Sequence, residues 1–264
     1  MKLILSALLL MGTLAAQDFS TRYDVKVGMF GKVGYADISL TEDANSYEIK
    51  LVAKMTGTAA TLTGNRVETY ISEGKIIDGE YIPDIFYKIR TSNDKSMNQM
   101  YTFNHEKKEV TMDEKKIEVI HGTRFDASSF KIVSTEETKK ISHTETLEKY
   151  IPSDILSTYL NTRRTCNEES RYYDLVAIGA RNDRNNITVS FLDDEQRDNA
   201  KGSFTKDVGN IYNLNVEPLD KDKTTVDILM AFDNDGLMKE AVLGKAFWIG
   251  EVKAERVYHD VASK

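Results

Sequence analysis

The chain has 264 residues, with 35 Lys and Arg against 42 Asp and Glu, and its formal net charge is -7 at pH 7. This negative balance, without any basic run, argues against nucleic-acid binding. The single cysteine, Cys166, excludes an internal disulfide, and the chain is long enough to be held by an apolar core instead.

The first residues have the features of a secretory signal peptide. Lys2 is followed by an apolar run from Leu3 to Leu14 and by two small residues, Ala15 and Ala16. The run is shorter than the roughly 20 residues of a membrane-spanning helix, and no cysteine stands at the junction to take a lipid anchor. We therefore expect residues 1–16 to be removed and the mature protein to be periplasmic, without a lipid anchor or a transmembrane segment.

Alternating side chains predict antiparallel strands through the first half of the chain, beginning at Phe19. The clearest strand is residues 46–55, SYEIKLVAKM, where Tyr47 and Ile49 share an apolar face and the charged residues lie on the other. The small, neutral residues 56–64 predict a loop or a short helical turn. Strands are then expected as far as His121.

Residues 122–150 lose this alternation and are rich in charged and hydroxyl side chains. This segment is longer than the connections between strands or helices that compact domains usually contain. We interpret them as a polar insertion, either an inserted excursion or a mobile loop.

One helix is predicted over about residues 153–164, where the apolar spacing changes from 2 to about 3.6. Ser153 is placed to cap its first turn. The residues expected on its apolar face are Ile155, Leu156, Tyr159, Leu160 and, at the end, Arg163. The residues expected to point away are Asp154, Ser157, Thr158 and Asn161.

Alternating segments resume at Tyr172 and continue to His259. Between two of them, Asp233 to Gly236 (DNDG) predicts a hairpin turn, and the acidic run at 193–195 is interpreted as a helix start rather than a catalytic carboxylate pair. The whole pattern predicts a mainly β protein with a curved antiparallel sheet, which either stays open as a half-barrel or closes into a barrel. The central helix is expected to cover an end of the sheet or its open face. We expect a single antiparallel β domain over residues 17–264.

The order of these segments resembles a family of exported bacterial proteins known only as a domain of unknown function. The matching stretches are YDVKVGMFGKVGYADISL from Tyr23, SYEIKLVAKMTG from Ser46, DILSTYLNTR from Asp154 and AFDNDGLMKEAVLGKAFWIGEVKAE from Ala231. This chain departs from the family's helix motif, in which Pro usually follows Asp. The resemblance implies a periplasmic, mostly antiparallel β protein, similar to curved-sheet carriers of lipid or lipoprotein, and it implies no catalytic residues.

The sequence contains no recognisable pattern for catalysis or metal binding. The four histidines lack metal-ligand spacing, and there is neither a Gly-x-Ser-x-Gly motif nor a glycine-rich phosphate loop. We therefore expect a protein that is not an enzyme and that uses no metal or cofactor.

The apolar strand faces could instead enclose a ligand cavity beneath the helix. The side chains that either line such a cavity or pack in the core are Met55, Leu62, Phe86, Tyr159 and Trp248. Arg163 has two interpretations: it satisfies carbonyl groups at the helix C-terminus, or it holds an anionic head group at the cavity entrance.

Two functions fit these features. The first is a periplasmic, non-catalytic binding or carrier protein for an apolar or amphiphilic ligand such as a lipid. The alternative is a structural or protein-interaction module of the cell envelope, which binds an envelope protein partner through an exposed strand edge or the polar insertion.

Overall fold

The computed structural model describes residues 18–165, 172–179, 184–205, 208, 210–218, 226–233, 236–244 and 251–258. In this part of the chain, a 14-stranded sheet forms in which neighbouring strands pair antiparallel. The strands are β1 Phe19–Val27, β2 Gly31–Glu42, β3 Ser46–Met55, β4 Val67–Ile77, β5 Glu80–Thr91, β6 Lys95–Asn104, β7 Glu109–Asp126, β8 Lys131–Thr146, β9 Tyr172–Ile178, β10 Arg184–Phe191, β11 Ile211–Pro218, β12 Val226–Phe232, β13 Met238–Leu243 and β14 Val252–Val257. The helices are the 3-10 turn η1 Gly28–Phe30, α1 Gly57–Leu62, α2 Ile155–Thr165 and α3 Asp194–Lys201.

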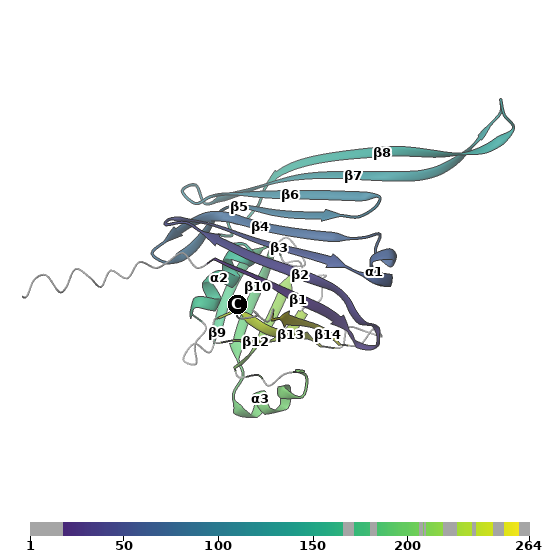
Figure 1. Ribbon diagram of the computed structural model, residues 1–264. Helices are drawn as coiled ribbons and strands as arrows, with labels where there is room; N and C mark the ends of the chain where they lie inside the picture. The colour runs from purple at the N-terminus through teal and green to yellow at the C-terminus, as the bar shows by residue number, and fades with distance from the viewer. Residues whose placement is uncertain are drawn as a thin grey trace, which may run out of the picture.

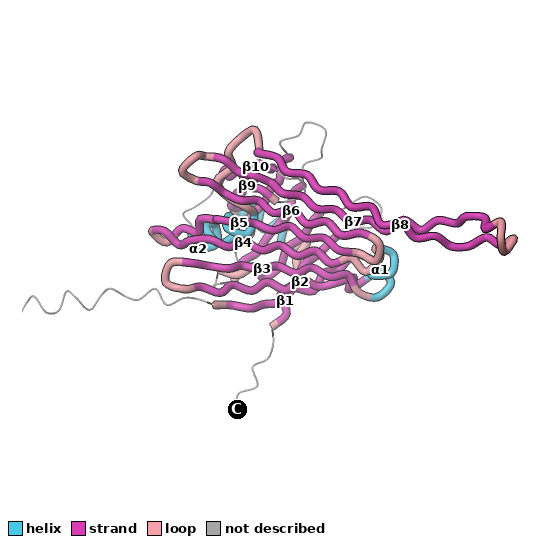
Figure 2. The backbone as a smooth tube through the Cα atoms, turned by 90° about the horizontal axis from the view of Figure 1, so that it is seen from above, coloured by secondary structure: helices cyan, strands magenta, loops and turns pink. Residues whose placement is uncertain are grey.

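The first and last strands of the chain meet in the middle of the sheet. The strand order is β8-β7-β6-β5-β4-β3-β2-β1-β14-β13-β12-β11-β10-β9, so β1 pairs with β14 while β8 and β9 form the outer edges. The sheet bends so that α2 lies between its two halves (Figures 1 and 2). The predicted fold class is confirmed, and in the described part of the chain the sheet stays open because β8 and β9 do not pair with each other.

The main core lies between α2 and the face of the sheet that curves around it. The helix contacts β3, β4 and β5 on one side and β9 on the other. Ile49, Phe86, Tyr101 and Leu160 are fully buried in this core. The helix therefore plugs the concave face of the sheet, and apolar side chains fill the contact between them.

The predicted helix is confirmed, but the prediction that its polar side faces water is wrong. Asp154 and Ser157 are fully buried, and Thr158 is only 8% exposed. Because β9 contacts α2 as well as β3 to β5, strands cover the helix on more than one side. A helical period identifies a solvent face only when one side of the helix is free.

The mobile-loop interpretation of residues 122–150 is wrong over most of the segment, whereas its interpretation as an insertion stays a prediction. β7 and β8 form a long hairpin that pairs from Thr111 with Thr146 to Asp126 with Lys131. β6 pairs with β7 only as far as Glu118, so the outer part of the hairpin projects beyond the sheet as a two-stranded ribbon (Figure 1). Both faces of such a ribbon meet water, which removes the reason for alternating polarity.

Other local predictions are confirmed. The predicted helical turn after β3 is α1, and the chain reverses between β12 and β13, where Gly236 N donates to Asp233 O at 2.9 Å. Asp193 caps α3 by accepting from Gln196 N at 2.8 Å in a capping box. Among the described residues, no helix is long and apolar enough to cross a membrane.

Candidate functional site

Polar groups at the two ends of α2 define the candidate site. At the N-terminal end, Asp154 Oδ1 accepts hydrogen bonds from the backbone N–H groups of Leu156 at 2.7 Å and Ser157 at 3.1 Å. Its Oδ2 accepts a hydrogen bond of 2.7 Å from the Ser72 hydroxyl of β4. Ser72 Oγ is also 2.9 Å from the Tyr47 hydroxyl of β3. The start of α2 is therefore connected to two strands through side-chain hydrogen bonds.

Asp154, rather than the predicted Ser153, is thus the capping residue. Burial raises the pKa of its carboxyl to about 6, because the ionised form loses its hydration, although the surrounding donors favour ionisation. Burial also raises the pKa of Tyr47, and the nearby Asp154 carboxylate adds to that effect. Both carboxyl oxygens of Asp154 already accept hydrogen bonds, which fits a structural role.

At the C-terminal end of α2, Asn161 hydrogen-bonds the backbone of Tyr81 in β5. Its Oδ1 accepts from Tyr81 N at 2.8 Å, and its Nδ2 donates to Tyr81 O at 3.0 Å. The pairing of β5 with β6 begins only at Ile85, so the amide takes the place that a neighbouring strand would occupy. These two bonds hold the C-terminal half of α2 against the sheet.

An open pocket of about 470 Å³ lies beside this end of α2. Three segments distant in sequence line it: the β4–β5 turn with Asp78, Gly79 and Glu80, α2 with Asn161 and Thr162, and β9 with Tyr173 and Leu175. The turn is tight because Asp78 and Gly79 both have positive φ, 51° and 82°.

The lining of this pocket is mixed in character. Tyr173 and Leu175 are half-buried and supply apolar surface, whereas Asn161 and Thr162 supply amide and hydroxyl groups. Small-molecule sites usually have volumes of about 300–1,000 Å³ and combine apolar walls with a few polar groups. The pocket therefore suits a ligand with an apolar part and a polar part.

The structure brings together only some of the residues predicted to bind a ligand. Phe86 is fully buried, and the half-buried Tyr159 packs against the same core. Met55 is half-buried at the end of β3. Leu62 is 82% exposed, so the prediction that it faces the interior is wrong. It lies on α1, a short helix at one end of the sheet, and not on a strand face.

The side chains of the other two predicted ligand residues, Arg163 and Trp248, are not described by the structure. The backbone of Arg163 belongs to α2 directly after Thr162, while the Arg163 side chain and Trp248 lie outside the described part of the chain. Asn161 was expected to point away from the sheet, and its contact with β5 was not predicted. An amide in a helix interior is unfavourable unless its side chain finds a partner, and that signal could have identified it.

A second hollow, of about 560 Å³, lies over β2 to β5. Its lining includes four carboxylates, Asp43, Glu48, Glu73 and Asp84, and Lys75 Nζ is 3.5 Å from Asp84 Oδ1. The described residues contain no group of three or more His, Cys, Asp or Glu side chains that could hold a metal ion. We interpret this hollow as acidic surface.

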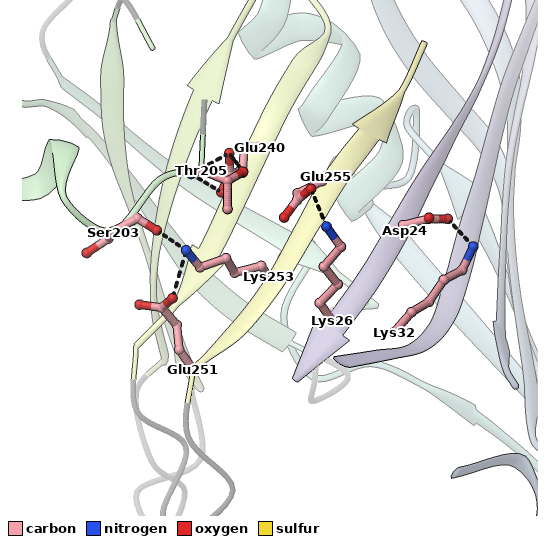
Figure 3. Close-up of polar contacts among 9 residues, drawn as sticks. All are labelled: Asp24, Lys26, Lys32, Ser203, Thr205, Glu240, Glu251, Lys253 and Glu255. Carbon is pink, nitrogen blue, oxygen red and sulfur yellow. Dashed lines mark hydrogen bonds and ion pairs between the residues drawn. The ribbon is translucent and has the colours of Figure 1, made fainter. Parts of the chain in front are cut away.

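A row of carboxylates also crosses the junction of β1, β14 and β13. Asp24, Glu255 and Glu240 are direct cross-strand neighbours. Their partners are Lys32 Nζ for Asp24 at 2.7 Å, Lys26 Nζ for Glu255 at 2.7 Å, and Thr205 N and Oγ1 for Glu240 at 3.0 and 2.9 Å (Figure 3). Each carboxylate has a partner, and the Lys26–Glu255 pair joins the first strand of the chain to the last.

The fold defines the class of this protein: an open antiparallel sheet wrapped around α2. The model of a family described as "Protein of unknown function (DUF3108)" matches residues 22–126, from β1 to the end of β7. The predicted resemblance to a family of unknown function with a curved antiparallel sheet is confirmed. No curated protein matches the chain.

Among the solved structures, the chain matches the crystal structure of a "Beta-barrel-like Protein of Domain of Unknown Function DUF1849 from Brucella abortus". The two chains share 10% sequence identity with a TM-score of 0.48, and the match covers 92% of this chain and 98% of that chain.

Proposed function

We propose that this protein is a non-catalytic binding protein for an amphiphilic ligand, such as a lipid, and that it acts in the periplasm. The observation that carries the proposal is the pocket of about 470 Å³ beside the C-terminal end of α2. Its apolar wall, Tyr173 and Leu175, would contact the apolar part of the ligand. The signal-like residues 1–16 support the periplasmic location.

The proposal puts the ligand in this open pocket rather than between α2 and the sheet. Fully buried side chains, among them Phe86, Tyr101 and Leu160, occupy the contact between the helix and the strands. A ligand at the end of the helix would leave that core intact. It would also contact β9, which is the edge strand of the sheet among the described residues.

Arg163 is the candidate partner for the polar end of the ligand. It follows the pocket-lining Thr162 in α2, and a guanidinium group pairs well with carboxylate or phosphate. Asp78 and Glu80 line the same pocket and carry negative charge, which would repel an anionic head group. An anionic head group would therefore depend strongly on Arg163.

Native mass spectrometry of the protein purified from the periplasm tests the proposal. We expect a stoichiometric added mass that organic extraction removes and that lipid analysis identifies. Arg163→Ala should reduce its occupancy, because the head group would lose its cation. A bare polypeptide mass in repeated native preparations would contradict the proposal and favour the interaction-module alternative.

The strand β9 provides a matched pair of variants. Leu175 lines the pocket, whereas its neighbour Val176 is 39% exposed and is absent from the lining. Leu175→Ser should lower ligand occupancy, and Val176→Ser should leave it unchanged. Circular dichroism and thermal unfolding of both variants separate a local loss of binding from a loss of the fold.

A further inference from the structure

The outer end of the β7–β8 hairpin exposes large apolar side chains to water. Phe125 is 61% exposed, Phe130 82% and Ile132 75%. We call residues 123–133 the hairpin tip. Since β6 pairs only as far as Glu118, the tip lies some seven residues further out, roughly 25 Å at the rise of a strand. Exposed apolar groups gathered at one place usually mark an interaction surface.

Hydrogen bonds hold the tip in a defined shape. Asp126 accepts from Ser128 N at 3.0 Å and from the hydroxyls of Ser128 and Ser129 at 2.7 Å each. Phe125 lies opposite Ile132 in the ribbon, and its ring meets that of Phe130 edge to face at 6.0 Å. The apolar side chains are therefore presented together.

Other exposed apolar residues lie at the same end of the sheet. Met29 is 84% and Phe30 56% exposed in η1, and Leu62 is 82% exposed on α1. In an antiparallel meander, the β1–β2, β3–β4 and β7–β8 connections all fall at one end, as Figure 2 shows. At the opposite end, the β4–β5 turn is flanked by Ile77, which is 48% exposed.

The tip also carries positive charge on an acidic protein. Residues 123–133 contain Arg124 and Lys131 against Asp126, a balance of +1 (2 minus 1), whereas the whole chain has a net charge of -7. Both cations are exposed, and within the described residues neither forms an ion pair. Apolar side chains flanked by Lys and Arg are typical of segments that enter the interface of anionic membranes.

We propose that the hairpin tip inserts Phe125, Phe130 and Ile132 into the surface of an anionic lipid bilayer, with Arg124 and Lys131 at the lipid phosphates. A narrow convex tip is a poor protein interface, because specific protein complexes bury about 1,200 Å² or more in matched surfaces. A bilayer requires no complementary pocket. This second site is independent of the pocket beside α2, so either proposal can fail without the other.

Vesicle flotation tests the proposal directly. We expect the mature protein to float with vesicles of phosphatidylcholine and phosphatidylglycerol, and more weakly with phosphatidylcholine alone. A variant with Phe125→Ser, Phe130→Ser and Ile132→Ser should bind at least roughly tenfold more weakly, because the apolar contribution is lost. Arg124→Ala and Lys131→Ala should each lower binding roughly fivefold, and only to the anionic vesicles.

The control changes exposed apolar residues elsewhere. A variant with Ile77→Ser and Tyr172→Ser removes side chains that are 48% and 63% exposed and lie away from the tip. It should bind vesicles as the wild type does. Equal losses in the control and the tip variant would reveal general stickiness and overturn the proposal, as would a wild type that binds neither vesicle. The latter result would favour a protein partner.

A fluorescent label locates the contact. Ala127 is exposed at the tip, and Lys50 is exposed in β3. An environment-sensitive dye on Ala127→Cys, in a Cys166→Ser background, should shift to the blue when anionic vesicles are added. The same dye on Lys50→Cys should not. A shift at Lys50→Cys alone would place the membrane contact elsewhere and reject the tip.

Discussion

Ser72 and Asp154 are 82 positions apart in the chain, yet the Ser72 hydroxyl donates to Asp154 Oδ2 at 2.7 Å. The bond connects β4 to the first turn of α2. It is buried, and the same carboxyl caps the helix. The position of α2 in the sheet therefore depends on the side chain of Asp154, which caps the helix and also attaches it to β4.

The first prediction concerns the pH dependence of stability. The folded-state pKa of Asp154 is raised from 3.8 to about 6. Its stabilising contribution is full below pH 3.8 and is lost as the pH rises to about 6, since the folded state binds the proton more tightly. Compared with Asp154→Asn, the wild type should lose about 3 kcal/mol of unfolding free energy over this range.

Urea unfolding at a series of pH values measures this difference. Other carboxyl groups titrate in both proteins, so subtracting one curve from the other isolates Asp154. A difference that stays constant between pH 4 and pH 6 would mean that the carboxyl ionises at its ordinary pKa.

The second prediction concerns Gly179, which follows β9. A Cβ atom at this position would lie 2.2 Å from Phe86 Cε1, and the φ angle of +97° disfavours other residues. Gly179→Ala should lower the free energy of unfolding by about 2–4 kcal/mol. Gly202→Ala is the control, because nothing lies within 4 Å of its Cβ and its φ is -62°. Denaturant midpoints that change equally in the two variants would refute the close contact.

The third prediction concerns the amide of Asn161. Asn161→Ala leaves the N–H and C=O of Tyr81 without these partners and should lower stability by about 1–3 kcal/mol. Thr162→Val removes the bond from Thr162 Oγ1 to Thr158 O, within the helix, and should have a smaller effect. Hydrogen exchange at the Tyr81 amide should accelerate in the first variant alone. Unchanged exchange there would show that Asn161 does not protect this strand.

The fourth prediction concerns the junction of the first and last strands. Glu255 is 9% exposed and pairs with Lys26 Nζ at 2.7 Å. Lys26→Met removes the cation from a buried carboxylate and should lower the unfolding free energy by about 1–3 kcal/mol. Adding Glu255→Gln should restore part of the loss. Lys32→Met, at a more exposed pair, should cost less than about 1 kcal/mol. Thermal unfolding of the four proteins gives the comparison, and a double variant less stable than Lys26→Met would contradict it.

Much of the secondary structure could be predicted because local patterns determine it. The alternation at residues 46–55, the helical spacing after Pro152 and the capping residue Asp193 all act through near neighbours. The β7–β8 ribbon could not be predicted in this way. With water on both faces, it carries none of the alternation that burial imposes on a strand.

The candidate site could be predicted much less well. The pocket joins residues 78–80, 161–162 and 173–175, which meet only when the sheet has curled around α2. Asp154 was expected in solvent and is fully buried, because strands cover the helix on the side that its own period leaves polar. Leu62 was expected inside and is exposed, since hydrophobicity alone does not place a residue on α1.

The pairing of β1 with β14 has a consequence for the order of folding. β1 and β14 are far apart in sequence, and the Lys26–Glu255 ion pair between them joins residues 229 positions apart. All other neighbouring strands in the sheet, within β1–β8 and within β9–β14, are consecutive in the chain. Local meanders form quickly, and contacts between distant segments form slowly. Each half of the sheet can therefore assemble on its own, but the two halves unite only when the last strand is present. A chain that stopped before Val252 would keep two bare strand edges open to other molecules.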